Sequence, residues 1–139
     1  SGIPTGRIAP VAGTPFDFTA PHPIGARIAA LIAERGGYDH NFALDCAGDG
    51  ARPAARLRAP RSGRVLTVST TLPGLQLYSG SCFDGTRRFR NGVATPRFGA
   101  VALETQHFPN APNEAGFPSP RLLPGERYAH TTVYGFDCA

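Results

Sequence analysis

The amino-acid sequence predicts an all-β protein. Turn-forming residues are dense, with 17 glycines and 14 prolines among 139 residues, and the segments between turns are short and rich in Val, Thr, Tyr, Phe and Leu. The helical connections that parallel strands require are missing. We therefore expect antiparallel strands arranged as a β-sandwich or a barrel, in one domain whose 41% hydrophobic content is sufficient to build a core.

One short helix is expected beside the strands, over residues Ile24–Arg35. Apolar side chains recur in this segment at Ile24, Ile28, Leu31 and Ile32, which is the spacing of one face of a helix. No other segment shows this period, so we expect this helix to be the only one.

A β-hairpin is predicted in the middle of the chain. Residues Arg56–Ala59 form its first strand, Pro60–Gly63 supply the turn, and Arg64–Thr71 form its second strand. The second strand reads RVLTVSTT, in which β-branched residues favour an extended backbone.

Three more strands are predicted after the hairpin: Leu75–Ser79, Phe98–His107 and Tyr128–Phe136. Two stretches, Ala47–Ala54 and Phe108–Arg121, are too rich in Gly, Pro and Asn for regular structure. The second of them follows directly on a strand, where a long loop held by prolines can shape the rim of a pocket.

Glu104 is the first candidate for chemistry. Side chains alternate between the two faces of a strand, so Glu104 shares its face with Ala100, Ala102 and Gln106. A carboxylate in this setting either faces water or lines a concave cavity. In a cavity, partial burial would raise its pKa toward the range that is useful for proton transfer.

Two further candidates lie in other parts of the chain. Asp39 belongs to the polar segment Gly36–Phe42, GGYDHNF, which either hydrogen-bonds vicinal sugar hydroxyls or forms a turn in which Asp and Asn bond their own backbone. Gln76 shares a strand face with Tyr78, and alternation leaves open whether it meets a ligand or faces water.

Charge and composition argue against several classes of partner. All 14 basic residues are arginines, and the net charge of +4 is thinly spread. The tight cluster Arg87, Arg88 and Arg90 is typical of a solvated loop, so nucleic acid is not an expected partner. No apolar run approaches the roughly 18 residues that a membrane-spanning helix needs, so no membrane partner is expected.

The sequence contains no motif that would bind a metal or a cofactor. Cys46, Cys82 and Cys138 do not have zinc-ligand spacing, and three isolated thiols fit better than one disulfide with a free thiol. No phosphate-binding glycine loop or nucleophile elbow is present. We therefore expect no bound metal and no cofactor.

Five strings, taken together, resemble the aldose 1-epimerase (galactose mutarotase) family. They occur in the family's order and cover nearly the whole chain, and the most specific pair is ETQHFPNAPN followed by the ending PGE-x-Y-x-H-TT-x-Y-x-F. The five strings are PVAGTPFDF (10–18), GGYDHNF (36–42), SGRVLTVSTTLPGLQLYSG (62–80), ALETQHFPNAPN (102–113) and FPSPRLLPGERYAHTTVYGF (117–136).

The resemblance implies a galactose mutarotase-like β-sandwich that interconverts the α and β anomers of free hexoses such as glucose and galactose without a cofactor. Matched motif by motif, the family's general base is similar to Glu104, its substrate-binding aspartate to Asp39, and the glutamine near the sugar to Gln76. In this family a glutamate takes the proton of the C1 hydroxyl while a histidine protonates the ring oxygen.

The family's acid histidine lies in an upstream motif that residues 1–139 lack. We therefore expect this chain to be the C-terminal portion of a single aldose 1-epimerase domain. We also expect a second polypeptide, carrying the N-terminal half, to dock on it through a large interface, because a sandwich cut in the middle leaves open strand edges and an apolar face.

The origin of the break before Ser1 stays open between proteolysis and self-cleavage through the serine hydroxyl. Two alternatives to the enzyme also stay open. One is a non-catalytic carbohydrate-binding or regulatory relative of the same fold. The other is a family member acting on phosphorylated or otherwise modified sugars, for which Arg87–Arg90 is a faint hint.

Overall fold

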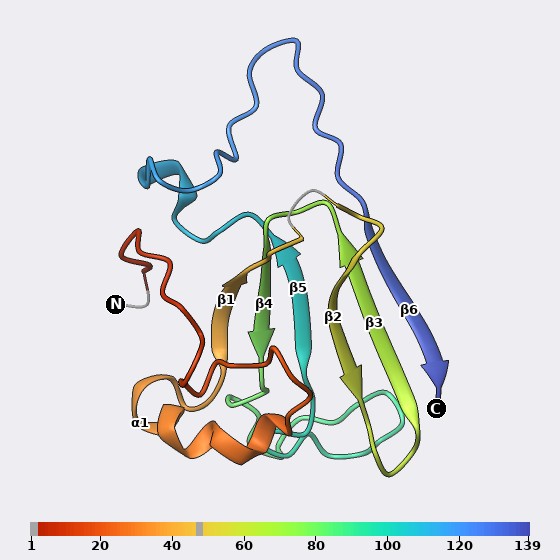
Figure 1. Ribbon diagram of the computed structural model, residues 1–139. Coiled ribbons are helices and arrows are strands. Elements are labelled where there is room, and N and C mark those ends of the chain that lie inside the picture. Colours follow the sequence, from red (N-terminus) through yellow and green to blue (C-terminus); the bar gives the residue numbers. More distant parts are fainter. Residues whose placement is uncertain (1–2, 47–48) are drawn as a thin grey trace. The chain divides into compact units, whose positions relative to one another are not determined.

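The computed structural model describes residues 3–46 and 49–139, so Ser1 lies outside the described residues. The six strands form two three-stranded sheets, ordered β1-β4-β5 and β2-β3-β6, with neighbouring arrows running in opposite directions (Figure 1). This arrangement confirms the all-β prediction. In chain order the elements are η1 (Ile24–Leu31), α1 (Ile32–Arg35), β1 (Asp39–Ala43), β2 (Pro53–Arg58), β3 (Arg64–Thr70), β4 (Gly74–Tyr78), β5 (Ala102–Gln106), η2 (Ala111–Asn113) and β6 (Thr132–Cys138).

The chain divides into two compact units. Unit 1 comprises Ser1–Arg7, Asn41–Leu75 and Thr105–Ala139, and unit 2 comprises Ile8–His40 and Gln76–Glu104. The whole β2-β3-β6 sheet belongs to unit 1, whereas the helical segment belongs to unit 2. Strands β1, β4 and β5 contribute residues to both units.

The predicted hairpin is confirmed as β2 and β3. Its turn closes through backbone bonds in which the N–H groups of Ser62 and Gly63 donate to the carbonyl of Ala59. Gly63 has a φ of 71°, a left-handed conformation that glycine adopts without strain. The first strand begins earlier than expected, at Pro53, with an irregularity in register between Pro53 and Ala55.

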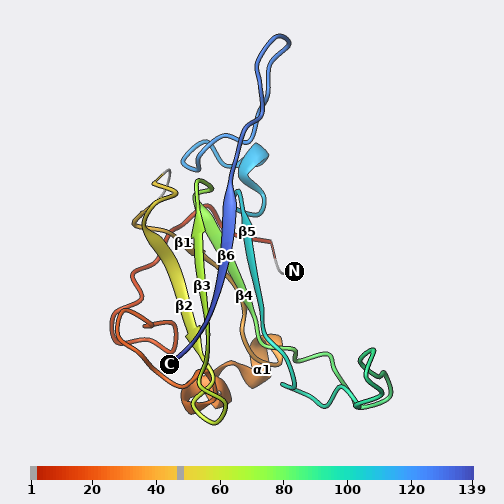
Figure 2. The ribbon, with the colours of Figure 1, turned by 90° about the vertical axis from the view of Figure 1, so that its right-hand side faces the viewer.

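Strand β6 pairs antiparallel with β3 along its whole length, from Thr132 opposite Thr70 to Cys138 opposite Arg64. Figure 2 shows the two strands side by side. At one end of the pair, the Oγ1 atoms of Thr70 and Thr132 lie 3.1 Å apart and that of Thr105 lies 2.7 Å from Thr132. This hydroxyl chain satisfies polar groups at a place where Thr70 is fully buried.

The helical segment has the predicted bounds but not the predicted geometry. Residues 24–31 form a 3-10 helix, and only residues 32–35 are α-helical. The 3-10 pattern begins where the N–H of Ala26 bonds the carbonyl of Pro23, three residues back. Gly36, with a φ of 72°, ends the helix by donating its N–H to Ile32. Leu31 is the buried residue of the predicted stripe, while Ile32 is 39% exposed.

One predicted turn and the bounds of two predicted strands differ from the structure. The turn interpretation of residues 39–42 is wrong because these residues belong to β1, where backbone pairing overrides the low strand propensity of Asp and Asn. Strand β5 begins at Ala102 rather than Phe98, since the N–H of Gly99 bonds Pro96 in a turn. Strand β6 begins at Thr132 rather than Tyr128 and runs two residues further than expected.

The stretch predicted to be irregular, Phe108–Arg121, contains the single 3-10 turn η2 and otherwise no regular structure. The first irregular stretch differs from the prediction because β2 takes in its last two residues, and Ala47 and Gly48 lie outside the described residues. The arginine cluster lies in an exposed loop, where Arg88 pairs with Ala94 in an isolated bridge.

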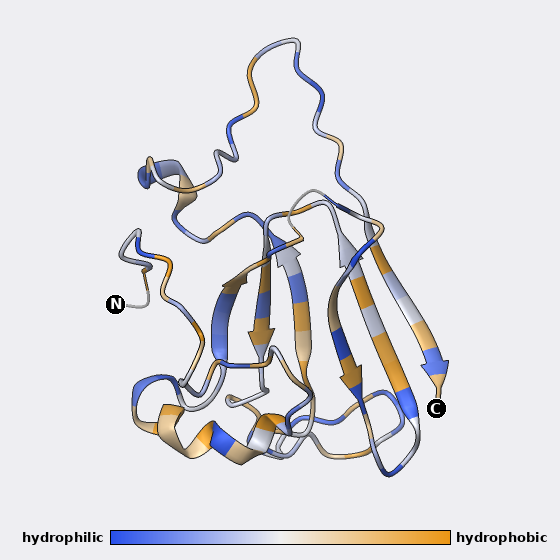
Figure 3. Cartoon of the chain, viewed as in Figure 1, coloured by the Kyte–Doolittle hydropathy of each residue, from blue (hydrophilic) through white to orange (hydrophobic). Residues whose placement is uncertain are grey.

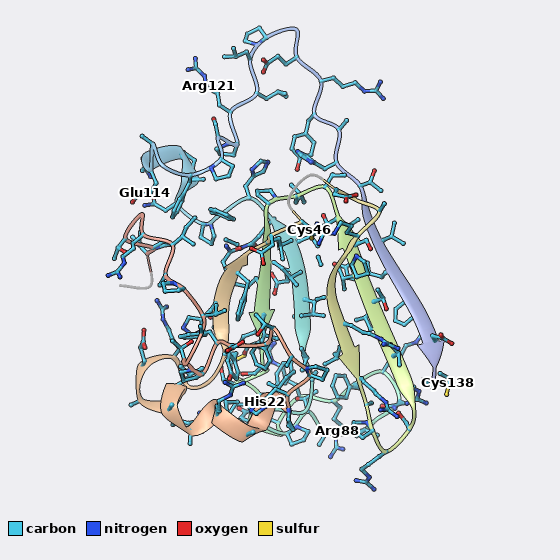
Figure 4. All side chains as sticks on the ribbon, viewed as in Figure 1. His22, Cys46, Arg88, Glu114, Arg121 and Cys138 are labelled. Atoms are coloured by element: carbon cyan, nitrogen blue, oxygen red, sulfur yellow. The ribbon has the colours of Figure 1, made fainter. Side chains whose placement is uncertain are left out.

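The three cysteines are free thiols, as the sequence predicts. Figure 4 shows Cys138 at the C-terminal end of β6 and Cys46 toward the opposite end of the same sheet. Among the described residues the longest helical element has eight residues, and none is of the length and apolarity needed to cross a membrane.

Candidate functional site

The three predicted site residues lie on the three strands of one sheet. Asp39 opens β1, Gln76 is the middle residue of β4 and Glu104 is the middle residue of β5. All three belong to unit 2. Because β4 is hydrogen-bonded between β1 and β5, Gln76 lies on the strand that separates the two carboxylates.

Asp39 and Gln76 are in direct contact. The Nε2 amide of Gln76 donates a hydrogen bond of 2.8 Å to Oδ1 of Asp39. A bond to a carboxylate is stronger than one between neutral groups, and it restricts the rotation of both side chains. Asp39 is itself exposed, so its second oxygen is available to accept hydrogen bonds from a ligand.

Glu104 is exposed on β5, and its carboxylate has no hydrogen-bond or ion-pair partner within residues 3–46 and 49–139. The partial burial that a cavity would give it is therefore not provided by the described chain. A carboxylate without a competing partner is free to accept a proton from a bound hydroxyl.

A second polar contact, within unit 1, crosses the centre of the same sheet. Nε2 of Gln106, on β5, donates to Oδ1 of Asn41, on β1, at 3.2 Å. The two side chains meet over Gly74 of β4, where an added Cβ would lie 2.6 Å from Oδ1 of Asn41. Alternation along the strand places Gln106 on the face of Glu104 but does not predict this contact. The sequence signal that could have indicated it is Gly74, whose missing side chain leaves room for Asn41 and Gln106 to meet.

His40 follows Asp39 and is half-buried. Its Nδ1 accepts a hydrogen bond of 3.1 Å from the backbone N–H of Asp39, and its ring packs edge-on against Phe16 at 4.7 Å between centroids. Burial lowers the pKa of His40 below its ordinary value of 6.5, and Glu34 and Asp39 oppose this effect only in part. The imidazole is therefore neutral at pH 7, in agreement with an Nδ1 that accepts.

We expect acid to destabilise the protein through His40. Because its pKa is lower in the folded than in the unfolded chain, the unfolded chain binds more protons as pH falls. The stabilisation is complete above about pH 6.5 and is lost as pH falls through the folded pKa. An NMR titration should give a His40 pKa below the ordinary value of 6.5, and His40→Asn should flatten the dependence of stability on pH in this range.

A separate cavity lies in unit 1. It has a volume of about 510 Å³ and is lined in part by His107, Arg121, Tyr128 and His130. The pKa of His107 is lowered by burial and then by His130, whose ring centroid is 5.4 Å away. None of the three predicted site residues lines this cavity, and within the described ranges no group of three or more His, Cys, Asp or Glu residues could hold a metal ion.

Comparisons with known proteins identify the family to which the chain is similar. A family model described as aldose 1-epimerase matches residues 1–135. The galactose mutarotase of Mus musculus is 43% identical over 137 residues, covering 99% of this chain and 39% of that protein. The aldose 1-epimerase of Escherichia coli K12 is 38% identical over 139 residues, covering 97% of this chain and 40% of that protein.

A solved structure has a similar fold. The crystal structure of an aldose epimerase homologue from C. elegans matches with a TM-score of 0.73 and 25% identity, covering 98% of this chain and 40% of that chain. This match confirms the expected fold class. The chain spans about 40% of the length of the relatives that it matches, and the matched part is their C-terminal portion.

Proposed function

Because this chain belongs to the aldose 1-epimerase family, we propose that it carries the general base and part of the sugar-binding site of an enzyme that interconverts the α and β anomers of free hexoses. The observation that supports this proposal is the arrangement of Asp39, Gln76 and Glu104 on three strands of one sheet. The bonded pair of Asp39 and Gln76 can bind the hydroxyl groups of a small polyol, and the carboxylate of Glu104 can accept a proton from one of them.

In the proposed reaction, Glu104 removes the proton of the C1 hydroxyl. The bond between C1 and the ring oxygen breaks, and an acid histidine of the preceding part of the fold gives its proton to that oxygen. Rotation about the C1–C2 bond exposes the other face of the aldehyde. Closure then returns both protons, so that acid and base end in their starting states and no cofactor is consumed.

The site is completed by a polypeptide that carries the N-terminal part of the fold. The chain spans about 40% of the length of its relatives, and Glu104 is exposed in the chain alone. A covering segment would exclude water from the carboxylate, and exclusion of water strengthens each interaction with the substrate.

Polarimetry tests this proposal. Residues 1–139 would be co-expressed with the unmatched N-terminal part of the Escherichia coli relative, and the purified complex added to freshly dissolved α-glucose or α-galactose. We expect the optical rotation to reach its equilibrium value faster than in buffer. A complex that binds either sugar in calorimetry without accelerating this change would favour the non-catalytic, carbohydrate-binding alternative instead.

A further inference from the structure

One face of the β2-β3-β6 sheet carries apolar side chains in register across three strands. Leu57 of β2 lies opposite Leu66 of β3, which lies opposite Phe136 of β6. In the next row Val68 of β3 lies opposite Tyr134 of β6. Figure 3 shows apolar bands alternating with paler ones along β3 and β6. We call Leu57, Leu66, Val68, Tyr134 and Phe136 the β6 face.

The side chains of the β6 face become more exposed from strand β3 to strand β6 and, along β6, toward the C-terminus. Val68 is fully buried and Leu66 is half-buried, whereas Tyr134 is 45% and Phe136 is 82% exposed. At the other end of β6, Thr132 is bonded to Thr105, so the uncovered part is the Phe136 end. A sheet face with large apolar side chains is normally covered by a second layer.

The outer edge of β6 is also open. Within the described residues β6 pairs with β3 on one side, and no strand is paired with its other side. The N–H of Thr71 bonds the carbonyl of Thr131, and the N–H of Ala139 bonds that of Gly63. Since bonded pairs alternate along an antiparallel ladder, the N–H and C=O of Phe136 point away from β3.

An open edge beside an uncovered apolar face is suited to accept another strand. We propose that the β6 edge and the β6 face together receive a β-strand from the N-terminal part of the aldose 1-epimerase fold. The unmatched length of the relatives, about 60% of the Escherichia coli protein, supplies an occupant. A second copy of this chain would cover the same surface without completing the site.

The inference rests on the proposed function for the identity of the partner but is tested separately from activity. Residues 1–139, with an affinity tag, would be co-expressed with the N-terminal part of the Escherichia coli relative. Phe136→Asp is expected to lower the amount of co-purified partner at least tenfold, because a charge would then be buried beside Leu66. Phe136→Tyr should retain the partner.

Phe89→Asp is the matched control. Phe89 is also an exposed aromatic residue, at 40%, but it lies in unit 2, away from β6 in sequence and sheet. The Phe89→Asp variant should co-purify as much partner as the unsubstituted chain does. Since Phe136 is 82% exposed, Phe136→Asp alone should keep the circular dichroism spectrum and melting temperature of the parent chain.

Hydrogen exchange supplies a local measurement. In the complex the amide of Phe136 should exchange at least tenfold more slowly than in the chain alone. The proposal is overturned if no complex forms, if Phe136→Asp binds the partner normally, or if protection comes from a dimer of residues 1–139 that the partner does not displace. A complex that forms as expected but leaves the rate of anomer interconversion unchanged would refute the proposed function and not the docking surface.

Discussion

Glu104→Gln is expected to lower the rate of anomer interconversion by the assembled enzyme by a factor of about 10² to 10⁴, the usual contribution of a general base. Glutamine has nearly the shape of glutamate but cannot take up the C1 proton. Because Glu104 is exposed and has no partner within the described ranges, its replacement removes no folded-state contact. The initial rate of change in optical rotation of α-galactose measures the effect.

Glu34→Gln is the control for this experiment. Glu34 lies in α1, is also exposed and is absent from the predicted site. Its replacement changes the net charge by the same amount and should leave the rate within a factor of two. If the two variants were equally active, Glu104 would not be the base, although the family assignment would still stand.

Asp39→Ala is expected to lower kcat/KM by about tenfold to 150-fold, which corresponds to the roughly 1.5 to 3 kcal/mol of a hydrogen bond to a charged group. One oxygen of Asp39 is held by Gln76 at 2.8 Å, and in the proposed function the other accepts a hydrogen bond from a hydroxyl of the sugar. The loss should appear mainly in KM if the contact is equally strong in the ground and transition states.

A double-mutant cycle distinguishes two roles of Gln76. If Gln76 acts only by orienting Asp39, the double variant Asp39→Ala/Gln76→Leu should be no less active than Asp39→Ala alone. If Gln76 also binds the sugar, as the resemblance implies, the double variant should lose a further factor of several. Initial rates over a range of galactose concentrations would separate these outcomes.

The parts of the fold that depend on local signals could be predicted from the sequence. The β-branched run in β3 and the turn at Pro60–Gly63 are of this kind, and both are confirmed. The sequence does not predict strand β1 because Asp39 and Asn41 are poor strand formers, and their conformation comes from pairing with a segment more than 30 residues away. The left-handed Phe98, with a φ of 61°, likewise has no local signal.

The candidate site likewise contains some features that local sequence patterns predict and others that depend on contacts between strands. Alternation along a strand was enough to place Glu104 and Gln106 on one face of β5. It could not show that Gln76 would bond Asp39, or Gln106 bond Asn41, because contacts between strands depend on register. The exposure of Glu104 was equally beyond prediction, since it depends on which segments cover the sheet.

Gly74 makes two positions interdependent. A methyl group there would meet Oδ1 of Asn41 at 2.6 Å and the backbone carbonyl of Gln106 at 3.0 Å. Shortening Asn41 would relieve the first clash but would also remove the acceptor of the Gln106 amide. Anyone redesigning this sheet must therefore treat residues 41, 74 and 106 as a single unit and replace them together.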